Sequence, residues 1–401
     1  MLKKRVPWWM YLTAAVYTLT FCFNARQEGW GPANTGWVPL GPTFAVANVA
    51  PGSAMAKAGL RAGDVLETAN GRPLTGMPDW FVARAHFERD HPIELQVLRG
   101  GQHVSLPVVI TAPAWRTWSR THLVGAVAFY FVRFILLVLA MVVAFSRPGR
   151  FRARLVALML AVGAVAEGYP SSGWAGALHH LPAVLAVPIC LATASCLMAS
   201  LLWLPFFATF RPTWLSKRWR RALVFVPGVV FGLPMLASAI EMIYAPSVLA
   251  RPWPQLLSAT PVRLIQDIAG VSPLLFLNVL PAYGTMTQRA LLELWFTVSV
   301  LYFAAGFLIL IVSYRVLDDM HERRRLGTLA AAVATFGLIV AHNILGRNWR
   351  NWFGSAPPGW LGPAASLGIN ALFLFVPLTL AYYVLTENRQ TGEKSTHAAV
   401  N

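Results

Sequence analysis

Residues 122–145 read HLVGAVAFYFVRFILLVLAMVVAF, a run that contains one basic residue, Arg133, and no acidic residue. A helix needs about 20 consecutive apolar residues to cross the hydrocarbon core of a bilayer. An ionisable side chain inside such a run is costly and marks a functional candidate. The stretch therefore predicts a transmembrane helix and makes the chain a membrane protein.

Comparable apolar runs recur along the rest of the chain. One, from Val6 to Phe23, follows Lys3-Lys4-Arg5, and the others lie at roughly 155–170, 182–210, 222–245, 291–314, 326–345 and 361–385. Together with 122–145 they predict eight transmembrane helices. The composition agrees, since 56% of the 401 residues are hydrophobic and 12% are charged, about half the charged fraction of a typical soluble domain. The stretch 246–290 is broken by prolines, so it indicates interfacial or re-entrant structure.

The first apolar run is either an uncleaved anchor or a signal peptide. A cleavage site needs small residues just beyond the apolar stretch, whereas this run ends in Phe21-Cys22-Phe23. We therefore expect an uncleaved anchor over residues 1–23. The orientation of the later helices is the same in both cases.

The net charge of +17 follows the pattern of the membrane segments. The segments predicted to be cytoplasmic hold 18 Lys and Arg residues, against five in the outer loops between helices; they are 3–5, 147–154, 211–221, 315–325 and the tail 386–401. Cytoplasmic loops of membrane proteins carry such an excess. We expect a multi-pass protein of a bacterial inner membrane with both termini in the cytoplasm. Nucleic acid is not an expected partner, because the basic residues form no single stripe.

Residues 24–121 differ in composition and predict a soluble α+β domain on the outer side of the membrane. Alternating strands are expected at 44–49, 65–68, 93–98 and 104–110, with turns at Asn70-Gly71 and Gly100-Gly101. Ser53 is a plausible N-cap for a short helix that ends at Gly59. Pro78 suits the first turn of a second helix that runs to about Phe87.

Within this domain, the spacing of Val49-Ala50-Pro51-Gly52-Ser53, Ala58-Gly59-Leu60, Gly63-Asp64-Val65 and Asn70-Gly71 resembles the bacterial form of the PDZ family. The resemblance covers Leu40 to about Ile110. It implies that the domain captures an extended peptide, often a free C-terminus, as an added strand. Gly59, Gly63, Asp64 and Gly71 are assigned to turns.

By resemblance, the peptide site combines a carboxylate-binding loop at 39–43 with the receiving strand Phe44-Ala45-Val46. The helix 78–87 forms the other wall, with Phe81 and Ala85 on one face and Trp80 and Arg84 on the next. Pro42 departs from the family pattern, because proline has no backbone N–H to offer the carboxylate. The expected peptide-binding residues are Leu40, Gly41, Thr43, Phe44, Ala45, Val46, Phe81 and Ala85.

Five ionisable residues inside the predicted spans form a second set of candidates. Arg133 lies near the middle of its span, and four others lie near the outer ends of theirs: Glu167, Glu241, Glu293 and His342. One hypothesis is an outer-leaflet polar cluster in which an acid pairs with Arg133. The alternative is that each residue meets interfacial water separately.

An enzymatic role is not expected, and neither is a metal or cofactor. A membrane zinc protease needs His-Glu-x-x-His, but Arg325 occupies the last position after His321-Glu322. An intramembrane serine protease pairing Ser171 or Ser172 with His342 is a weaker alternative.

The order of anchor (1–23), PDZ-like domain (24–121) and seven-helix module (122–385) resembles the input half of bacterial sensor kinases, without the kinase domain. Only residues 386–401 follow, a short cytoplasmic tail. We expect a sensor or receptor that binds peptide or protein C-termini in the envelope and passes a signal to a cytoplasmic partner, or else a truncated sensor. A non-signalling adaptor for envelope proteins is the alternative, and membrane lipids are the other expected partner.

Overall fold

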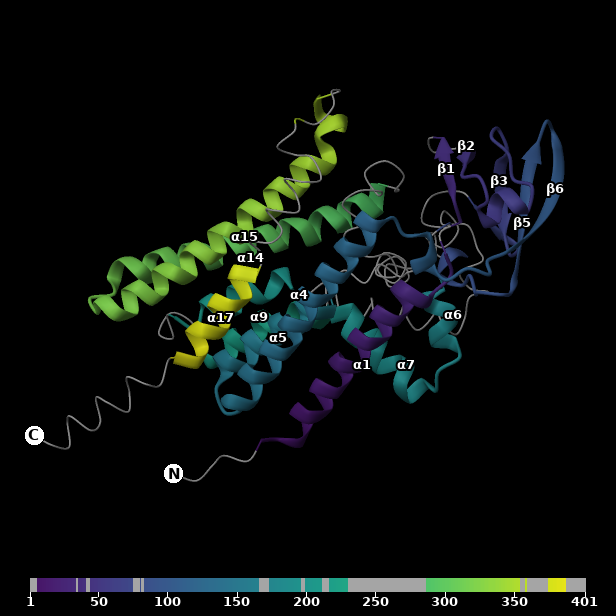
Figure 1. Ribbon diagram of the computed structural model, residues 1–401. Helices are drawn as coiled ribbons and strands as arrows, with labels where there is room; N and C mark the ends of the chain where they lie inside the picture. The colour runs from purple at the N-terminus through teal and green to yellow at the C-terminus, as the bar shows by residue number, and fades with distance from the viewer. Residues whose placement is uncertain are drawn as a thin grey trace, which may run out of the picture.

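The structure is a computed structural model, and it describes residues 6–33, 35–40, 44–74, 80, 83–165, 173–195, 199–210, 216–229, 286–353, 358 and 374–386. Within these ranges the chain forms a sheet domain beside a group of helices (Figure 1).

The sheet domain is built on one antiparallel sheet. Its strands are β1 (Trp37–Leu40), β2 (Ala45–Val49), β3 (Val65–Ala69), β4 (Arg72–Pro73), β5 (Pro92–Arg99) and β6 (Gln102–Val109). They lie in the order β1-β2-β3-β5-β6, and β4 pairs only with β3. The longest pairing joins β5 to β6, from Pro92 opposite Val109 to Arg99 opposite Gln102.

Turn residues set the boundaries of these strands as the sequence predicts. Asn70 and Gly71 both have positive φ, 49° and 73°, and close the β3–β4 hairpin. Gly100 and Gly101 do the same between β5 and β6. Ser53 caps helix α2 (Ala54–Lys57) by accepting a hydrogen bond from Ala56 N at 3.1 Å. The predictions for these elements are confirmed, whereas Pro39 and Leu40, which end β1, were expected in a loop.

The core of the sheet domain is closed by the region of the second predicted helix. Trp80 and residues 83–85 are helical, and Trp80 meets the fully buried Phe87 edge-to-face at 5.5 Å between ring centroids. Both rings belong to one buried cluster with Leu66, Leu95 and Val97 of the sheet. The sheet domain therefore has its own hydrophobic core.

Two helices run between the sheet domain and the far end of the helical part. Helix α1 (Trp8–Trp30) continues beyond the predicted anchor and ends next to the sheet domain, where Pro32 bridges to Pro113. Helix α4 (Arg120–Ser146) begins just after the sheet domain, following the short 3-10 helix η2 (Ala114–Thr117). At 1.5 Å per residue their lengths are about 34 Å and about 40 Å, enough to cross a bilayer core of about 30 Å.

The remaining helices overlap the other predicted spans within the described residues, except α6 (Trp174–His179), which lies between the spans predicted at 155–170 and 182–210. They are α5 (Phe151–Val165), α6 (Trp174–His179), α7 (Ala183–Ala194), η4 (Ser200–Leu202), α8 (Trp203–Phe207), α9 (Lys217–Pro227), α14 (Met286–Val316), α15 (Met320–Phe353) and α17 (Phe375–Thr386). Helices α1, α4, α5, α8, α14, α15 and α17 share one hydrophobic core. The region 246–285 lies outside the described residues.

By length and apolarity, one helix in the described ranges qualifies as a membrane span, His122–Ser146. Three shorter apolar helices accompany it: Ala183–Thr193, Leu301–Val316 and Phe375–Thr386. The number of spans therefore stays a prediction.

Candidate functional site

Strand β1 is one of the two edge strands of the sheet, and β6 is the other. Strand β1 pairs with β2 on one side, with Trp37 opposite Val49 and Leu40 opposite Ala45, and no described strand pairs with its other side. A β-bulge interrupts the pairing between Val38 and Pro39. Proline and bulges are typical of edge strands, so both features fit this position.

The backbone of β1 presents hydrogen-bonding groups to this open edge. Ala50 donates its N–H to the carbonyl oxygen of Gly36 at 2.7 Å, which makes Gly36 and Ala50 a hydrogen-bonded pair. Pairs in an antiparallel ladder alternate, so the N–H and C=O of Trp37 point away from β2. An extended peptide could pair with these groups, although Pro39 offers no donor.

The expected receiving strand was wrong by one strand. Phe44-Ala45-Val46 belongs to the interior of the sheet, because β1 covers one side of β2 and β3 covers the other. Val46 donates its N–H to Asp64 O at 2.7 Å and accepts from Gly63 N at 2.8 Å. The side chains of Phe44 and Val46 are buried in the core. A peptide has no access to this backbone, so the candidate edge moves to β1.

The predicted helix 78–87 was expected to form one wall of the peptide site, and the described part of it has a different environment. Ala85 is 1% exposed and packs against Trp174, Ala175 and Leu178 of α6, not in a peptide groove. Of the other predicted peptide-binding residues, Leu40 lies at the end of β1. Gly41, Thr43 and Phe81 lie outside the described residues.

The sheet domain is joined to the helices through Gly173. This residue donates its N–H to the carbonyl of Arg84 at 3.0 Å, and its own carbonyl accepts from Gln27 Nε2 of α1 at 3.1 Å. Gly173 has φ 78°, and a Cβ there would lie 2.5 Å from the carbonyl oxygen of Phe87. Only glycine satisfies both the left-handed backbone and this close approach. We call this contact region the junction.

Next to the junction, Glu88 of the sheet domain makes polar contacts with two histidines. The carboxylate of Glu88 lies 3.0 Å from His180 Nε2 and 3.6 Å from His91 Nδ1. These histidines are mostly exposed, so the contact is open to water. In the described part of the chain, no three His, Cys, Asp or Glu side chains converge as metal ligands would.

Asp64 stabilises the turn before β3. Its role is structural and it does not belong to the candidate peptide site. Its buried carboxylate accepts from Arg61 N at 2.8 Å and, through both oxygens, from Arg99 Nε and Nη2 at 2.7 Å. Arg99 Nη2 also donates to Gly59 O at 2.7 Å. The hydrogen bonds from Arg99 hold the pKa of Asp64 below its ordinary value, although burial acts in the opposite direction.

Among the predicted intramembrane residues, Arg133 has a buried side chain with two aromatic contacts. It is 2% exposed on α4, and its guanidinium lies over the rings of Phe129 at 4.7 Å and Tyr130 at 5.4 Å. His342 is buried on α15, and Glu293 falls on α14. Glu167 and Glu241 lie outside the described residues. An acid partner for Arg133 stays a prediction.

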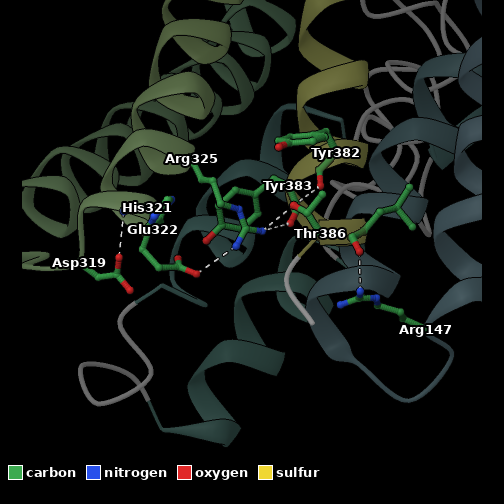
Figure 2. A network of polar contacts seen from close by, with 9 residues as sticks. Arg147, Asp319, His321, Glu322, Arg325, Tyr382, Tyr383 and Thr386 are labelled. Carbon is green, nitrogen blue, oxygen red and sulfur yellow. Dashed lines mark hydrogen bonds and ion pairs between the residues drawn. The ribbon is translucent and has the colours of Figure 1, made fainter. Parts of the chain in front are cut away.

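At the other end of the helices, arginines bind the carboxyl ends of neighbouring helices (Figure 2). Arg325 Nη2 donates to Tyr383 O at 2.7 Å and to Thr386 Oγ1 at 2.9 Å, while its Nη1 meets Glu322 at 3.0 Å. Arg147 donates to Leu385 O at 2.5 Å, and Arg152 to Thr209 O at 2.9 Å. We call this region the arginine-rich end.

Sequence reasoning identified the arginines of this end but not their partners. It assigned 147–154 and 315–325 to cytoplasmic loops, yet the partner carbonyls lie far along the chain and no local pattern marks them. Glu322, the acidic residue of the His321-Glu322 pair, forms an ion pair with Arg325.

Comparisons with protein-family models, with curated proteins and with solved structures gave no match. The candidate site therefore depends on its own geometry.

Proposed function

We propose that this chain is a multi-pass receptor of a bacterial inner membrane. In this proposal its PDZ-type sheet domain binds peptide or protein C-termini outside the membrane. The ligand adds as a strand along β1. The binding signal passes through the helices to a cytoplasmic partner, without catalysis by the chain itself.

The observation that carries the proposal is the open edge of β1. Its outward-facing groups at Trp37 belong to a short edge strand, at the opposite edge of the sheet from β6. Such an edge is the receptor surface in peptide capture by strand addition, where backbone hydrogen bonds supply much of the affinity.

The junction supports a receptor over a passive tether. Gly173 contacts the carbonyl of Arg84 in the sheet domain and the side chain of Gln27 in α1. A shift of the helical segment 83–85 would therefore change contacts to both α1 and α6. A binding event can shift an equilibrium only through contacts that differ between two states, and these are the contacts available.

The membrane orientation is supported by where the arginines lie. Arg147 and Arg325 meet at the end of α17 (Figure 2), and α17 lies away from the sheet domain (Figure 1). Arg152 binds Thr209 nearby. Arg154 joins them, because its guanidinium lies 5.2 Å over the ring of Trp9 near the start of α1. In the proposal this end faces the cytoplasm.

The test uses full-length protein in lipid nanodiscs and extended peptides that carry a single N-methyl group at successive positions. We expect N-methylation to abolish binding at every second position, because only alternate peptide N–H groups face β1. Amidation of the C-terminus should weaken binding further. Uniform tolerance of N-methylation would contradict strand addition. Peptide binding that leaves the conformation of the arginine-rich end unchanged would favour the alternative of a non-signalling adaptor.

A further inference from the structure

Two groups of basic side chains at the arginine-rich end differ in their partners. Those of the first group are bound within the protein: Arg147, Arg152 and Arg325 donate to carbonyls near the carboxyl ends of other helices, and Arg154 donates to Pro148 O at 2.7 Å. Helix carboxyl ends carry partial negative charge, so these cations are electrostatically satisfied.

The second group lies at the start of α9. The side chains of Arg218 and Arg221 are exposed, and neither guanidinium makes a hydrogen bond or ion pair within the described part of the chain. Arg220 lies between them, and its Nε is buried without a hydrogen-bond partner there. Trp219, next to these arginines, is 66% exposed.

These arginines lie at the end of a helix that already carries positive charge. Ser216 caps α9 by accepting from Trp219 N at 3.4 Å, which fixes Lys217 as the first helical residue. The N-terminus of a helix favours anions and disfavours cations. Four basic residues, Lys217, Arg218, Arg220 and Arg221, within the first five positions therefore concentrate positive charge instead of neutralising it.

The other half of α9 is apolar and equally uncovered. Phe225 and Val226, together with Val229 just beyond the end of α9, are each more than half exposed, and Val226 lies two turns beyond Trp219 on the same side of the helix. The opposite side holds α9 to the protein, since Val224 packs against the helix core and Pro227 is buried. From Arg221 to Val229 the helix rises about 12 Å, the distance from a lipid phosphate into the acyl chains.

We propose that the start of α9 binds an anionic phospholipid. Arg218 and Arg221 hold the phosphate, because a guanidinium can donate two parallel hydrogen bonds to it. Trp219 lies at the headgroup level, where tryptophan is enriched. The acyl chains lie along Phe225, Val226 and Val229. This inference rests on the proposed orientation, with the arginine-rich end in the cytoplasm.

The experiment compares lipid binding by full-length protein in detergent, using native mass spectrometry. The probes are phosphatidylglycerol and phosphatidylcholine with identical acyl chains. The site variant is R218Q/R221Q, and the matched control is R323Q/R324Q, which removes two exposed charges from α15 at the same end. Both variants are compared as monodisperse protein with unchanged thermal midpoints.

We expect wild type and the control to prefer phosphatidylglycerol, and the site variant to bind it about thirtyfold more weakly, as the loss of two surface charges predicts. An unchanged preference in the site variant, or an equal loss in both variants, would overturn the lipid site. Displacement of the lipid by inorganic phosphate would also overturn it, since a soluble anion would then suffice.

A second experiment, in which a cysteine is labelled from each side of the membrane, distinguishes a failure of the lipid site from a failure of the proposed function. His321→Cys places an exposed thiol at the arginine-rich end of a chain in which Cys22, Cys190 and Cys196 are replaced by alanine. Labelling from the cytoplasmic side without a lipid preference would overturn the lipid site alone. Labelling from the outer side would contradict the orientation on which both depend.

Discussion

At the residue scale, the sheet domain depends on a few positions that do not touch the proposed peptide. Asp64 is one of them, because its buried carboxylate joins the turn before β3 to the end of β5 through Arg99. Sequence spacing assigned Asp64 to a turn. Its ion pair could not be predicted, since Arg99 lies on a strand whose register with β3 is set by tertiary packing.

Replacing Asp64 with alanine leaves the Arg61 N–H and the Arg99 guanidinium without their acceptor. We expect the free energy of unfolding of the sheet domain to fall by about 2 kcal/mol. Pulse proteolysis of the full chain would measure this. Replacing Glu94, exposed on β5, with alanine is the control, expected to cost under about 0.5 kcal/mol.

The same pair gives a pH dependence with a definite sign. The folded pKa of Asp64 is lowered, so its stabilisation is complete above the ordinary carboxyl pKa of about 4 and is lost as the pH falls through the lowered value. The stability difference between wild type and Asp64→Asn should therefore shrink below about pH 4. A difference that grows on acidification would contradict this assignment.

Gly173 is the second such position. Alanine there would need a left-handed backbone and would press on the Phe87 carbonyl and on Pro32. We expect Gly173→Ala to destabilise the protein by about 2 kcal/mol, seen as a lower thermal midpoint in detergent. Gly125→Ala on α4 is the control, because a Cβ there meets nothing within 4 Å. Equal midpoints for the two variants would show that the junction tolerates a side chain.

At the element scale, the sequence pattern predicted strands that are flanked by turn residues, but it missed β1. Strands β3, β5 and β6 are flanked by Gly63, Asn70-Gly71 or Gly100-Gly101, and each was predicted within a few residues. β1 was missed because Pro39 interrupts a run of four residues. A proline is compatible with an edge strand. Pro39 therefore made β1 difficult to predict, yet it also indicates that β1 lies at an edge of the sheet.

The carboxyl end of α17 offers a test at this scale. Arg325→Met removes the hydrogen bonds to Tyr383 O and Thr386 Oγ1 and the contact with Glu322. We expect a loss of about 2 kcal/mol in the free energy of unfolding and faster hydrogen exchange in the last turn of α17. The neighbouring exposed Arg324→Met should change stability by no more than about 0.5 kcal/mol. Unchanged exchange in α17 would contradict a capping role for Arg325.

At the scale of the whole molecule, the sequence predicted an α+β domain within a helical chain, and the described residues form a sheet domain beside a group of helices (Figure 1). The number of membrane spans and the PDZ assignment stay predictions. What the sequence could not supply is the way the two parts meet. Ala85 was expected to face a ligand, yet it packs on α6, because the surface of a helix does not reveal which neighbour will cover it.

The junction also has a consequence for biogenesis. The last strand of the sheet domain ends at Val109, whereas Gly173 and α6 leave the ribosome only after all of α4 and α5 have been made. Domains generally fold as units during synthesis, so the nascent sheet domain would fold before its docking partner exists. Until then the surface around Ala85 stays uncovered, which makes this interval the stage of synthesis at which an assembly factor could recognise the unfinished protein.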